Sequence, residues 1–413
     1  MAVRKPAARE AGDMIAPPEP DLTPDEMLRR AVAMRQTLRE RQDKTEAHGS
    51  ILPETNAEFI KAGFYRIVQP RRFGGYEFDM VSFVRVMMEI ARGCPSSGWV
   101  LALTAGHPLI LSVFGDEAQF DAYGTDGEFR CPAVGTPAMM TPVEGGWRCN
   151  GAWDYASGCD MATHLLGGAM RIGTDGQPVH MHVLLKRGEF SILDNWQMIG
   201  MQGTGSKRVI ADNLLLPAHR VVDWTIWQTP PARDMKNLLL TNPLYHGRKS
   251  AFLIGEATAV AIGIARGALD LFEEIMAKPQ RFGGGTGTRA ELMEYQEYWG
   301  LARAWIDTAE NAMLQVARDY TEHCRAWVED GVPFADEADR AMILVEQHCV
   351  KLAWEATDLL FTSAGTSSGR RDSKIARHFR DLAVLRTHGT MRYMRTATNA
   401  ARLHFGMAPL SPL

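Results

Sequence analysis

The sequence predicts an α+β protein that is mostly helical, with helical, β and helical parts in that order. Apolar residues recur with the 3.6-residue period of amphipathic helices in both outer parts, and with a period of two between them. The length of 413 residues also exceeds what one simple core accommodates. We expect a flexible tail over 1–24, a helical domain over 25–126, a central β domain over 127–235 and a helical bundle over 236–413.

The N-terminal domain follows a tail rich in proline, alanine and charge, which lacks the apolar core of an export signal. Segments 27–42, 56–67 and 81–94 each place apolar side chains on one face of a helix, and Pro95 ends the third. The stretch 96–115 is apolar almost throughout. We therefore expect this stretch to be buried.

The central domain shows the alternation of antiparallel strands. The segment 141–151 indicates two strands joined by a turn at Gly145-Gly146, and 164–187 indicates a second hairpin. Further strands are expected within 190–196 and 207–217, and another turn at Asn150-Gly151. These elements predict a compact antiparallel unit with a barrel-like shape.

Four helical segments with short connections follow, which predicts an antiparallel four-helix bundle. Several of these helices carry apolar residues on two sides, so we expect part of the bundle to contact other subunits. The segments span 250–277, 289–330, 338–365 and 373–405.

Composition excludes several classes of protein. The formal charge is 45 − 49 = −4, whereas a general nucleic-acid binder would have a strong basic excess. The sequence contains no run of about 18 apolar residues, so it predicts no membrane span. Six widely spaced cysteines form no C-x-x-C pair, which favours buried thiols in a cytoplasmic protein without a metal site. The sequence has no G-x-G-x-x-G motif, which is the motif that would indicate a nicotinamide site.

Two segments resemble those by which the acyl-CoA dehydrogenase superfamily holds its flavin. The first starts at Asn150 and has the form W-x-x-x-S-G, with Trp153 and Ser157, which is typical of the monooxygenase branch. In that branch the matching serine lies near the flavin N5 atom. The second runs from Trp196 to Pro217 and contains a glycine-rich stretch with hydroxyl groups, which suits the approach of backbone amides to an anion. By resemblance, the cofactor-binding residues here are Trp153, Ser157, Trp196, Thr204 and Ser206.

The tripeptide His388-Gly389-Thr390 stands where common acyl-CoA dehydrogenases have a glutamate, glycine and threonine. That glutamate removes the substrate α-proton, whereas an imidazole is suited to donating a hydrogen bond. The replacement resembles the two-component aromatic hydroxylases of this fold, including the 4-hydroxyphenylacetate and secosteroid 3-hydroxylases.

Four further residues follow from the same resemblance. His107 lies in a G-H-P segment similar to one in which phenol hydroxylases of the family carry the base for the substrate hydroxyl, and Trp99 resembles a residue that borders the same pocket. Arg281, in a shortened version of an R-x-x-F-G element, and Arg371 are the candidates for contacting the flavin phosphate.

The resemblance implies the oxygenase component of a two-component flavin-dependent monooxygenase. Such an enzyme takes reduced FMN or FAD from a separate NAD(P)H-dependent flavin reductase and uses O₂, through a C4a-hydroperoxyflavin, to hydroxylate a small aromatic, phenolic substrate. Its catalytic residues would be His107, Ser157 and His388, and it would be a homotetramer without a metal. The alternatives are an acyl-CoA dehydrogenase with FAD, an S- or N-oxidising monooxygenase of the same fold, and a scaffold that has lost its flavin.

Overall fold

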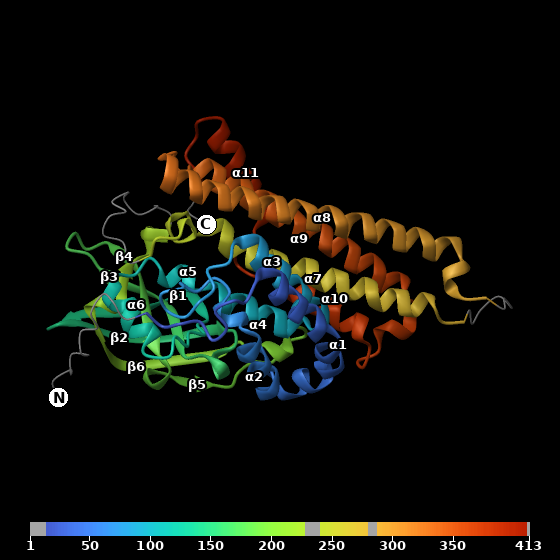
Figure 1. Ribbon diagram of the computed structural model, residues 1–413, viewed down its shortest axis with the longest axis horizontal. Helices are drawn as coiled ribbons and strands as arrows, with labels where there is room; N and C mark the ends of the chain where they lie inside the picture. The colour runs from blue at the N-terminus through green and yellow to red at the C-terminus, as the bar shows by residue number, and fades with distance from the viewer. Residues whose placement is uncertain (1–13, 228–239, 280–286, 411–413) are drawn as a thin grey trace.

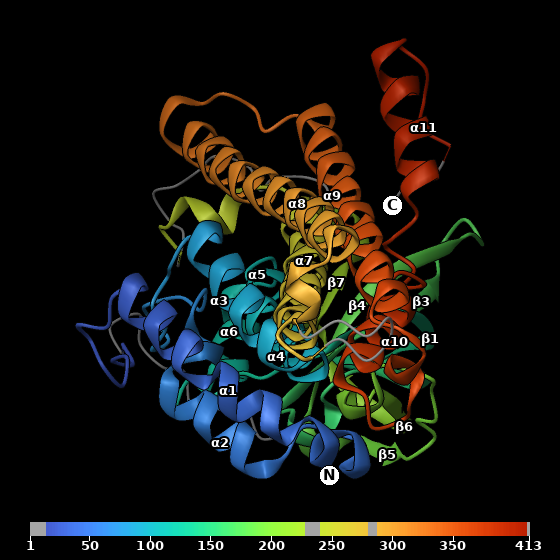
Figure 2. The ribbon, with the colours of Figure 1, turned by 90° about the vertical axis from the view of Figure 1, so that its right-hand side faces the viewer.

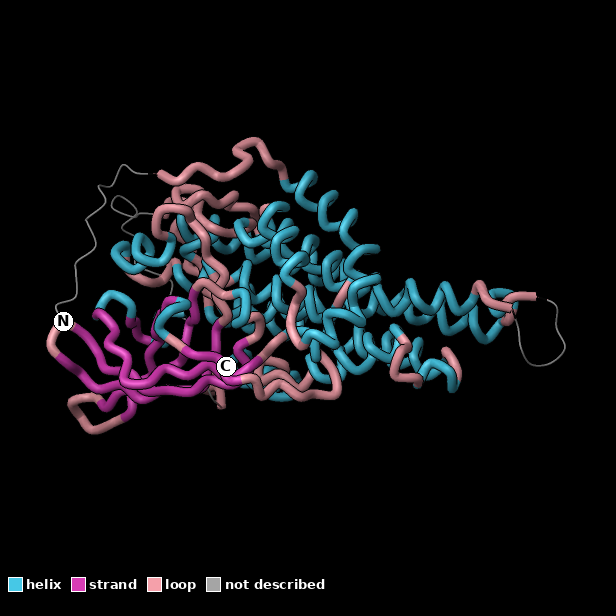
Figure 3. Tube along the Cα trace, turned by 90° about the horizontal axis from the view of Figure 1, so that it is seen from below, coloured by secondary structure: helices cyan, strands magenta, loops and turns pink. Residues whose placement is uncertain are grey.

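The computed structural model describes residues 14–227, 240–279 and 287–410. The strands gather at one end of the molecule, and the long helices of the C-terminal part extend away from them (Figure 1). A view from below separates the strand layer from the helices that cover it (Figure 3). The predicted fold class, mostly helical with a central sheet, is confirmed.

Six α-helices form the described N-terminal part, from residue 14 onward, and its sequence explains where they begin and end. Thr23 accepts the Glu26 N–H at the start of α1, and Asp79 accepts the Ser82 N–H at the start of α3. The apolar stretch after Pro95 forms α4 and α5, and it is buried as expected. The helices are α1 (Pro24–His48), α2 (Pro53–Ala62), α3 (Met80–Gly93), α4 (Pro95–Gly106), α5 (Pro108–Leu111) and α6 (Asp116–Tyr123).

The central part is one seven-stranded sheet in the order β5-β6-β2-β1-β3-β4-β7. All neighbouring strands are antiparallel except β1 and β3, which run parallel. Parallel pairing here differs from the wholly antiparallel unit that the sequence predicted. The strands are β1 (Ala133–Val143), β2 (Gly146–Ala156), β3 (His164–Ile172), β4 (Pro178–Lys186), β5 (Ser191–Leu193), β6 (Lys207–Pro217) and β7 (Val221–Asp223).

One predicted turn of this sheet is confirmed and the other is wrong. The β1–β2 turn does fall at Gly145, which has a φ of 80°. Asn150-Gly151, by contrast, lies inside β2, at a shift in the register with β6. Glycine is needed there for packing, because a Cβ atom on Gly151 would lie 2.4 Å from the Cβ of Ala138. A glycine that a strand needs for close packing can therefore be mistaken, in the sequence, for the glycine of a turn.

Five α-helices occur in the described C-terminal residues, 240–279 and 287–410, and the last of the four predicted segments is divided. It ends as α10 and resumes as α11, with the His388-Gly389-Thr390 tripeptide between them. Helix α7 is long and apolar enough to cross a membrane, yet 89% of its apolar window is buried inside the protein. The helices are α7 (Ser250–Met276), α8 (Met293–Arg325), α9 (Asp336–Ser363), α10 (Lys374–Leu385) and α11 (Tyr393–His404).

Helix α7 lies at the centre of the helical part, in contact with α3, α4, α8, α9 and α10 (Figure 2). Glycines allow close contacts among these helices. A Cβ on Gly263 would lie 2.4 Å from the Met88 carbonyl oxygen, and one on Gly98 would lie 2.6 Å from the Cα of Ala91. The first contact holds α7 against α3 and the second holds α4 against α3, while Gly158, just after β2, lies against Val100 of α4.

Candidate active site

The end of β2, helix α4 and the turn after α10 meet at one place. Trp99 of α4 donates from its indole N–H to the Ser157 Oγ at 3.0 Å. The same indole ring lies edge-on to the His388 imidazole, with ring centroids 5.4 Å apart. Three predicted site residues, from segments far apart in the chain, are therefore neighbours.

A chain of hydroxyl groups continues from this junction into the glycine-rich loop. The Ser157 Oγ lies 2.7 Å from the Ser206 Oγ, which lies 2.7 Å from the Thr204 Oγ1. Thr204 in turn donates to the Met201 carbonyl oxygen at 2.8 Å. All three hydroxyl groups are buried, and burial favours the complete set of hydrogen bonds seen here.

The hydrogen bonds of this chain have one consistent direction. Thr204 uses its only hydroxyl proton on a carbonyl, so it accepts the proton of Ser206, and Ser206 accepts the proton of Ser157. Ser157 also accepts the Trp99 indole N–H. Ser157 therefore has no proton left to give, and its remaining lone pair can accept one more hydrogen bond.

The loop that carries these hydroxyls is anchored from α10. Asp381 accepts the Met201 backbone N–H at 2.5 Å, and Met201 has a left-handed φ of 54°. Burial raises the pKa of Asp381 to about 7. Gly200 lies so close to α10 that a Cβ there would be 2.3 Å from the Arg380 carbonyl oxygen. The loop conformation thus depends on a contact with the C-terminal part.

An aromatic surface lies beside the loop. The Trp196 indole N–H donates to the Met201 carbonyl oxygen at 3.0 Å, and the Tyr155 ring stands perpendicular to the Trp196 ring, with centroids 6.1 Å apart. Tyr155 has a φ of 66° and 65% of its surface is exposed. A strained backbone that exposes a large aromatic side chain is a feature of binding sites rather than of cores. The surface and the hydroxyl groups together fit a ring compound with polar edges, as a flavin is.

His388 is held by its own turn. Its Nδ1 lies 2.8 Å from the Thr390 Oγ1 and accepts the Thr390 backbone N–H at 3.4 Å. Because Nδ1 is an acceptor, the neutral ring carries its proton on Nε2. Desolvation by surrounding protein atoms lowers the pKa of His388, although the residue keeps accessible surface. The ring is therefore neutral at pH 7, with an N–H donor available.

His107 lies at the other end of α4 and has a different environment. It donates from Nδ1 to the Cys131 carbonyl oxygen at 2.6 Å, and its Nε2 lies 3.5 Å from the Glu256 Oε2. Both side chains are almost completely buried. Glu256 is not among the site residues predicted from the sequence. Its signal is a lone glutamate within an apolar segment, on the face of α7 that periodicity predicts to be buried.

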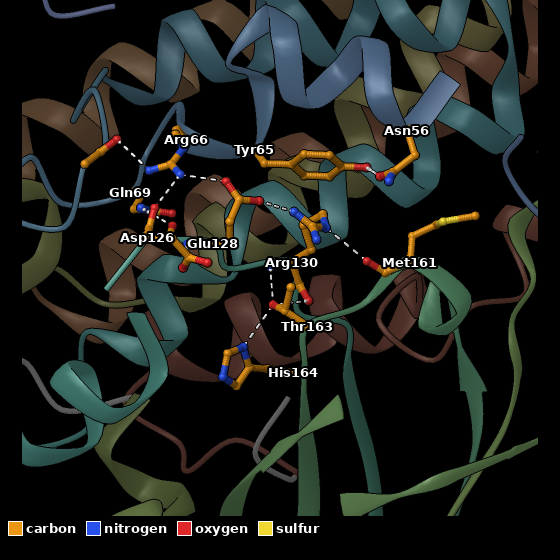
Figure 4. A network of polar contacts seen from close by, with 12 residues as sticks. Asn56, Tyr65, Arg66, Gln69, Asp126, Glu128, Arg130, Met161, Thr163 and His164 are labelled. Carbon is orange, nitrogen blue, oxygen red and sulfur yellow. Dashed lines mark hydrogen bonds and ion pairs between the residues drawn. The ribbon is translucent and has the colours of Figure 1, made fainter. Parts of the chain in front are cut away.

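A polar network fixes the segment that carries the Cys131 carbonyl (Figure 4). Glu128 binds the guanidinium group of Arg66 at 2.6 Å and also that of Arg130. The Arg130 backbone N–H donates to the Thr163 Oγ1 at 2.9 Å. Because Cys131 directly follows Arg130, these contacts hold the carbonyl group that orients the histidine.

Three predicted cofactor-binding residues are not part of this group. Trp153 is fully buried in the core of the sheet, where its indole N–H donates to the Gly168 carbonyl oxygen at 2.9 Å. It therefore has no surface to offer a cofactor, which corrects that assignment. Arg371 is exposed in the connection before α10, and Arg281 lies outside the described residues. Within the ranges that the structure describes, no group of three or more His, Cys, Asp or Glu residues could hold a metal ion.

Comparisons with known proteins agree with this architecture. The acyl-CoA dehydrogenase N-terminal domain family matches residues 24–125, and the C-terminal domain family matches residues 256–393. The chain is 30% identical, over 87% of its length and 93% of the relative's, to a flavin-dependent monooxygenase oxygenase subunit, HsaA, of Rhodococcus jostii. It is 26% identical, over 96% and 98%, to the oxygenase component of an FADH2-dependent resorcinol hydroxylase of a Rhizobium species.

A solved structure extends the agreement to three dimensions. The 3-HSA hydroxylase from a Rhodococcus species superimposes with a TM-score of 0.84 at 27% identity, covering 94% of this chain and 98% of that one. Sequence and fold lead to the same assignment. This chain belongs to the acyl-CoA dehydrogenase superfamily, as the oxygenase component of a flavin-dependent monooxygenase.

Proposed function

We propose that this oxygenase component hydroxylates a small phenolic substrate, with O₂ and with reduced FMN or FAD from a separate NAD(P)H-dependent reductase. The observation that carries the proposal is the meeting of Trp99, Ser157 and His388 at the glycine-rich loop. A histidine donor at this place suits oxygen chemistry, whereas an acyl-CoA dehydrogenase would need a carboxylate base. The relatives named above as resorcinol and 3-HSA hydroxylases support an aromatic substrate over a thioester.

The residues present fit a flavin. Trp196 and Tyr155 offer an aromatic edge, and Ser157 offers a lone pair whose direction Ser206 and Thr204 fix from behind. Arg371 is exposed and free to approach a phosphate, as a contact within one chain or across a homotetramer. When bound, reduced flavin supplies the electrons that activate O₂, and the protein supplies placement, exclusion of water and hydrogen bonds.

Ser157 and His388 have complementary hydrogen-bonding roles in this proposal. The direction of the hydroxyl chain leaves Ser157 as an acceptor, which suits an N–H group such as that at N5 of a reduced flavin. His388 presents the opposite polarity, an Nε2–H donor, for the oxygen that is to be transferred. Together the two residues would favour oxygen transfer over the loss of hydrogen peroxide.

His107 is the proposed base for the substrate hydroxyl. Its Nδ1–H is held by a carbonyl, so Nε2 is the nitrogen that can accept a proton. A phenolate is more electron-rich at its ortho carbon than a phenol, so removal of this proton would speed hydroxylation. Oxidation at sulfur or at an amine nitrogen would need no such base. The response to His107→Ala therefore distinguishes hydroxylation of a phenol from those alternatives.

The test starts from the purified chain mixed anaerobically with reduced FMN or FAD, followed by oxygenated buffer with and without a panel of phenols. We expect a near-ultraviolet absorbance band that precedes the return of oxidised flavin, and hydroxylated product with the correct phenol. Return of oxidised flavin without any preceding band, and hydrogen peroxide as the only product with every phenol, would overturn the proposal. Light scattering coupled to size exclusion tests the homotetramer in the same preparation.

A further inference from the structure

We propose that Glu256 sets the protonation state of His107, so that the two buried side chains hold one exchangeable proton between them. Glu256 is thus a positioning residue for the proposed base, and its catalytic consequence rests on the proposed function. The Cys131 carbonyl fixes a proton on Nδ1 of His107, which leaves only Nε2 to titrate. That Nε2 faces the Glu256 Oε2 at 3.5 Å.

The site is built to receive this carboxyl group. Glu256 rises from α7 toward the C-terminal end of α4, where Gly106 has no side chain. A Cβ on Gly106 would lie 1.8 Å from the Glu256 Oε1, so only glycine fits beneath the carboxyl group. Only 1% of the Glu256 side chain is accessible, and its Oε1 has no hydrogen-bond partner among the described residues. A buried carboxyl group in such a place is costly as an isolated anion.

Glu256 and His107 together have two protonation states that matter for catalysis. With one shared proton the pair is neutral overall, either as a protonated carboxyl beside a neutral imidazole or as an ion pair. With no shared proton it carries one negative charge, and the Nε2 lone pair can accept the proton of a substrate hydroxyl. In that transfer the substrate O–H bond breaks, an N–H bond forms, and the electron pair stays on the substrate oxygen. The carboxylate then stabilises the imidazolium formed.

The pKa of Glu256 agrees with this account. Burial raises it to about 7, and the only electrostatic influence that opposes burial comes from His107. Glu256 therefore changes protonation close to neutral pH. Since the substrate can lose its proton only to the deprotonated pair, the hydroxylation rate should rise as pH increases through this value and level off above it.

Other charged groups on the elements packed against α7 are paired or face elsewhere. Arg92 of α3 binds Asp270, and Asp307 and Glu310 of α8 bind Arg266. His378 of α10 lies at Gly267, three turns from Glu256. Glu346 of α9 lies against Gly255, and its pKa is affected by burial and by Asp339 but not by Glu256. His107 is therefore the group that governs the titration of Glu256.

Glu346 also provides a matched control. Like Glu256 it is a glutamate buried within the helical part, and its carboxyl oxygens have no hydrogen-bond partner among the described residues. Among the described residues, no hydrogen bond joins its carboxyl group to His107. Glu256→Gln and Glu346→Gln therefore remove equivalent groups, and only the first removes the partner of the histidine.

The first experiment uses the whole chain without flavin, labelled with ¹⁵N at histidine, and follows the imidazole nitrogens by NMR over pH. We expect His107 to keep its proton on Nδ1 and to titrate at Nε2. Glu256→Gln should make proton binding at Nε2 at least tenfold weaker, while Glu346→Gln leaves it unchanged. Glu256→Asp, which keeps the charge, should restore part of the effect and serves if the glutamine variant does not fold. Unchanged titration of His107 in both Glu256 variants would overturn the proposal.

The second experiment measures single-turnover hydroxylation over pH in the same variants. We expect Glu256→Gln to lose the rise with pH and to slow hydroxylation, with Glu346→Gln following the unmodified protein. Altered titration of His107 together with an unchanged hydroxylation rate would support the shared proton and remove the proposed role of His107 as substrate base. The two experiments thus separate failure of this inference from failure of the proposed function.

Discussion

The indole N–H of Trp99 donates to the Oγ of Ser157 at 3.0 Å, and the same indole ring lies edge-on to His388. One tryptophan on α4 therefore contacts both residues that are proposed to handle oxygen. The indole N–H is a donor only, so it fixes Ser157 as an acceptor and leaves the serine proton for Ser206. This contact and the bond from Thr204 to the Met201 carbonyl oxygen together fix the hydrogen bonds at the two ends of the hydroxyl chain.

Trp99→Phe should uncouple oxygen consumption from product formation. Phenylalanine keeps most of the ring but has no donor, so Ser157 can rotate and direct its proton elsewhere. We expect several-fold more hydrogen peroxide per reduced flavin oxidised, with little change in folding. The measurement is the ratio of peroxide to hydroxylated product in single turnovers. Trp305→Phe, a partly buried tryptophan on α8, is the control. Equal ratios in the two variants would contradict the assigned role of the Trp99 N–H.

Gly200→Ala should weaken flavin binding while the helices and sheet stay folded. The added Cβ would lie 2.3 Å from the Arg380 carbonyl oxygen, so the loop must move away from α10. We expect at least a tenfold higher dissociation constant for reduced flavin, measured by anaerobic titration. Gly300→Ala on α8 meets open space and should instead raise the free energy of unfolding by about 0.5–1 kcal/mol. If both variants bind flavin equally well, the loop does not depend on its contact with α10.

The sequence could predict the residues of the site where one motif holds them together. Trp196, Thr204 and Ser206 lie in one segment, and the structure keeps them adjacent. The anchor of that segment could not be predicted, because Asp381 is separated from Met201 by 180 residues. Periodicity places a residue on the buried face of a helix but does not identify the side chain opposite.

Trp153 shows a second limit on what the sequence can predict about the site. Regular alternation along β2 would put Trp153 and Tyr155 on the same side of the sheet. The register with β6 shifts between Trp153 and Ala156, and Tyr155 adopts a left-handed conformation. As a result Trp153 is buried and Tyr155 is exposed. An irregularity of this kind leaves no signature in the alternation of apolar residues, so the sequence did not predict that Tyr155 rather than Trp153 is exposed.

Asp381→Asn and Asp381→Ala should differ in flavin binding. Asparagine keeps an oxygen that can accept the Met201 N–H, whereas alanine leaves that buried N–H without its acceptor, at a cost of about 1–3 kcal/mol. We expect flavin affinity to be retained in the first variant and lost in the second, as measured by titration. Equal affinities in the two variants would show that the hydrogen bond does not hold the loop.

Asp381→Asn should also change how stability depends on pH. Burial raises the pKa of Asp381 from 3.8 to about 7, so the folded protein binds a proton that the unfolded chain releases. The stability that this group contributes is complete below the unfolded pKa of 3.8, and it is lost as pH rises through the folded pKa of about 7. The decline should be absent in Asp381→Asn, and urea unfolding across this pH range measures the difference. The same decline in the variant would assign it to other groups.

Glu346→Met should stabilise the protein, most of all at high pH. Glu346 is fully buried between α9 and α7, and neither carboxyl oxygen has a partner among the described residues. Burial raises its pKa well above 4.5, so the folded chain holds a proton there that the unfolded chain releases as pH increases. Stability therefore falls with rising pH by on the order of 1 kcal/mol per pH unit until the folded group ionises.

Methionine removes both this decline and the cost of burying an unpaired polar group, and its flexible side chain suits a site lined by Met80 and Met313. We expect the unfolding midpoint of Glu346→Met to exceed that of the unmodified protein by a margin that widens from acidic to neutral pH. Flavin affinity should stay the same, since Glu346 contacts none of the site residues. A margin that narrows with pH would mean that Glu346 is ionised and paired in the folded protein, and its use as a control for Glu256 would have to be abandoned.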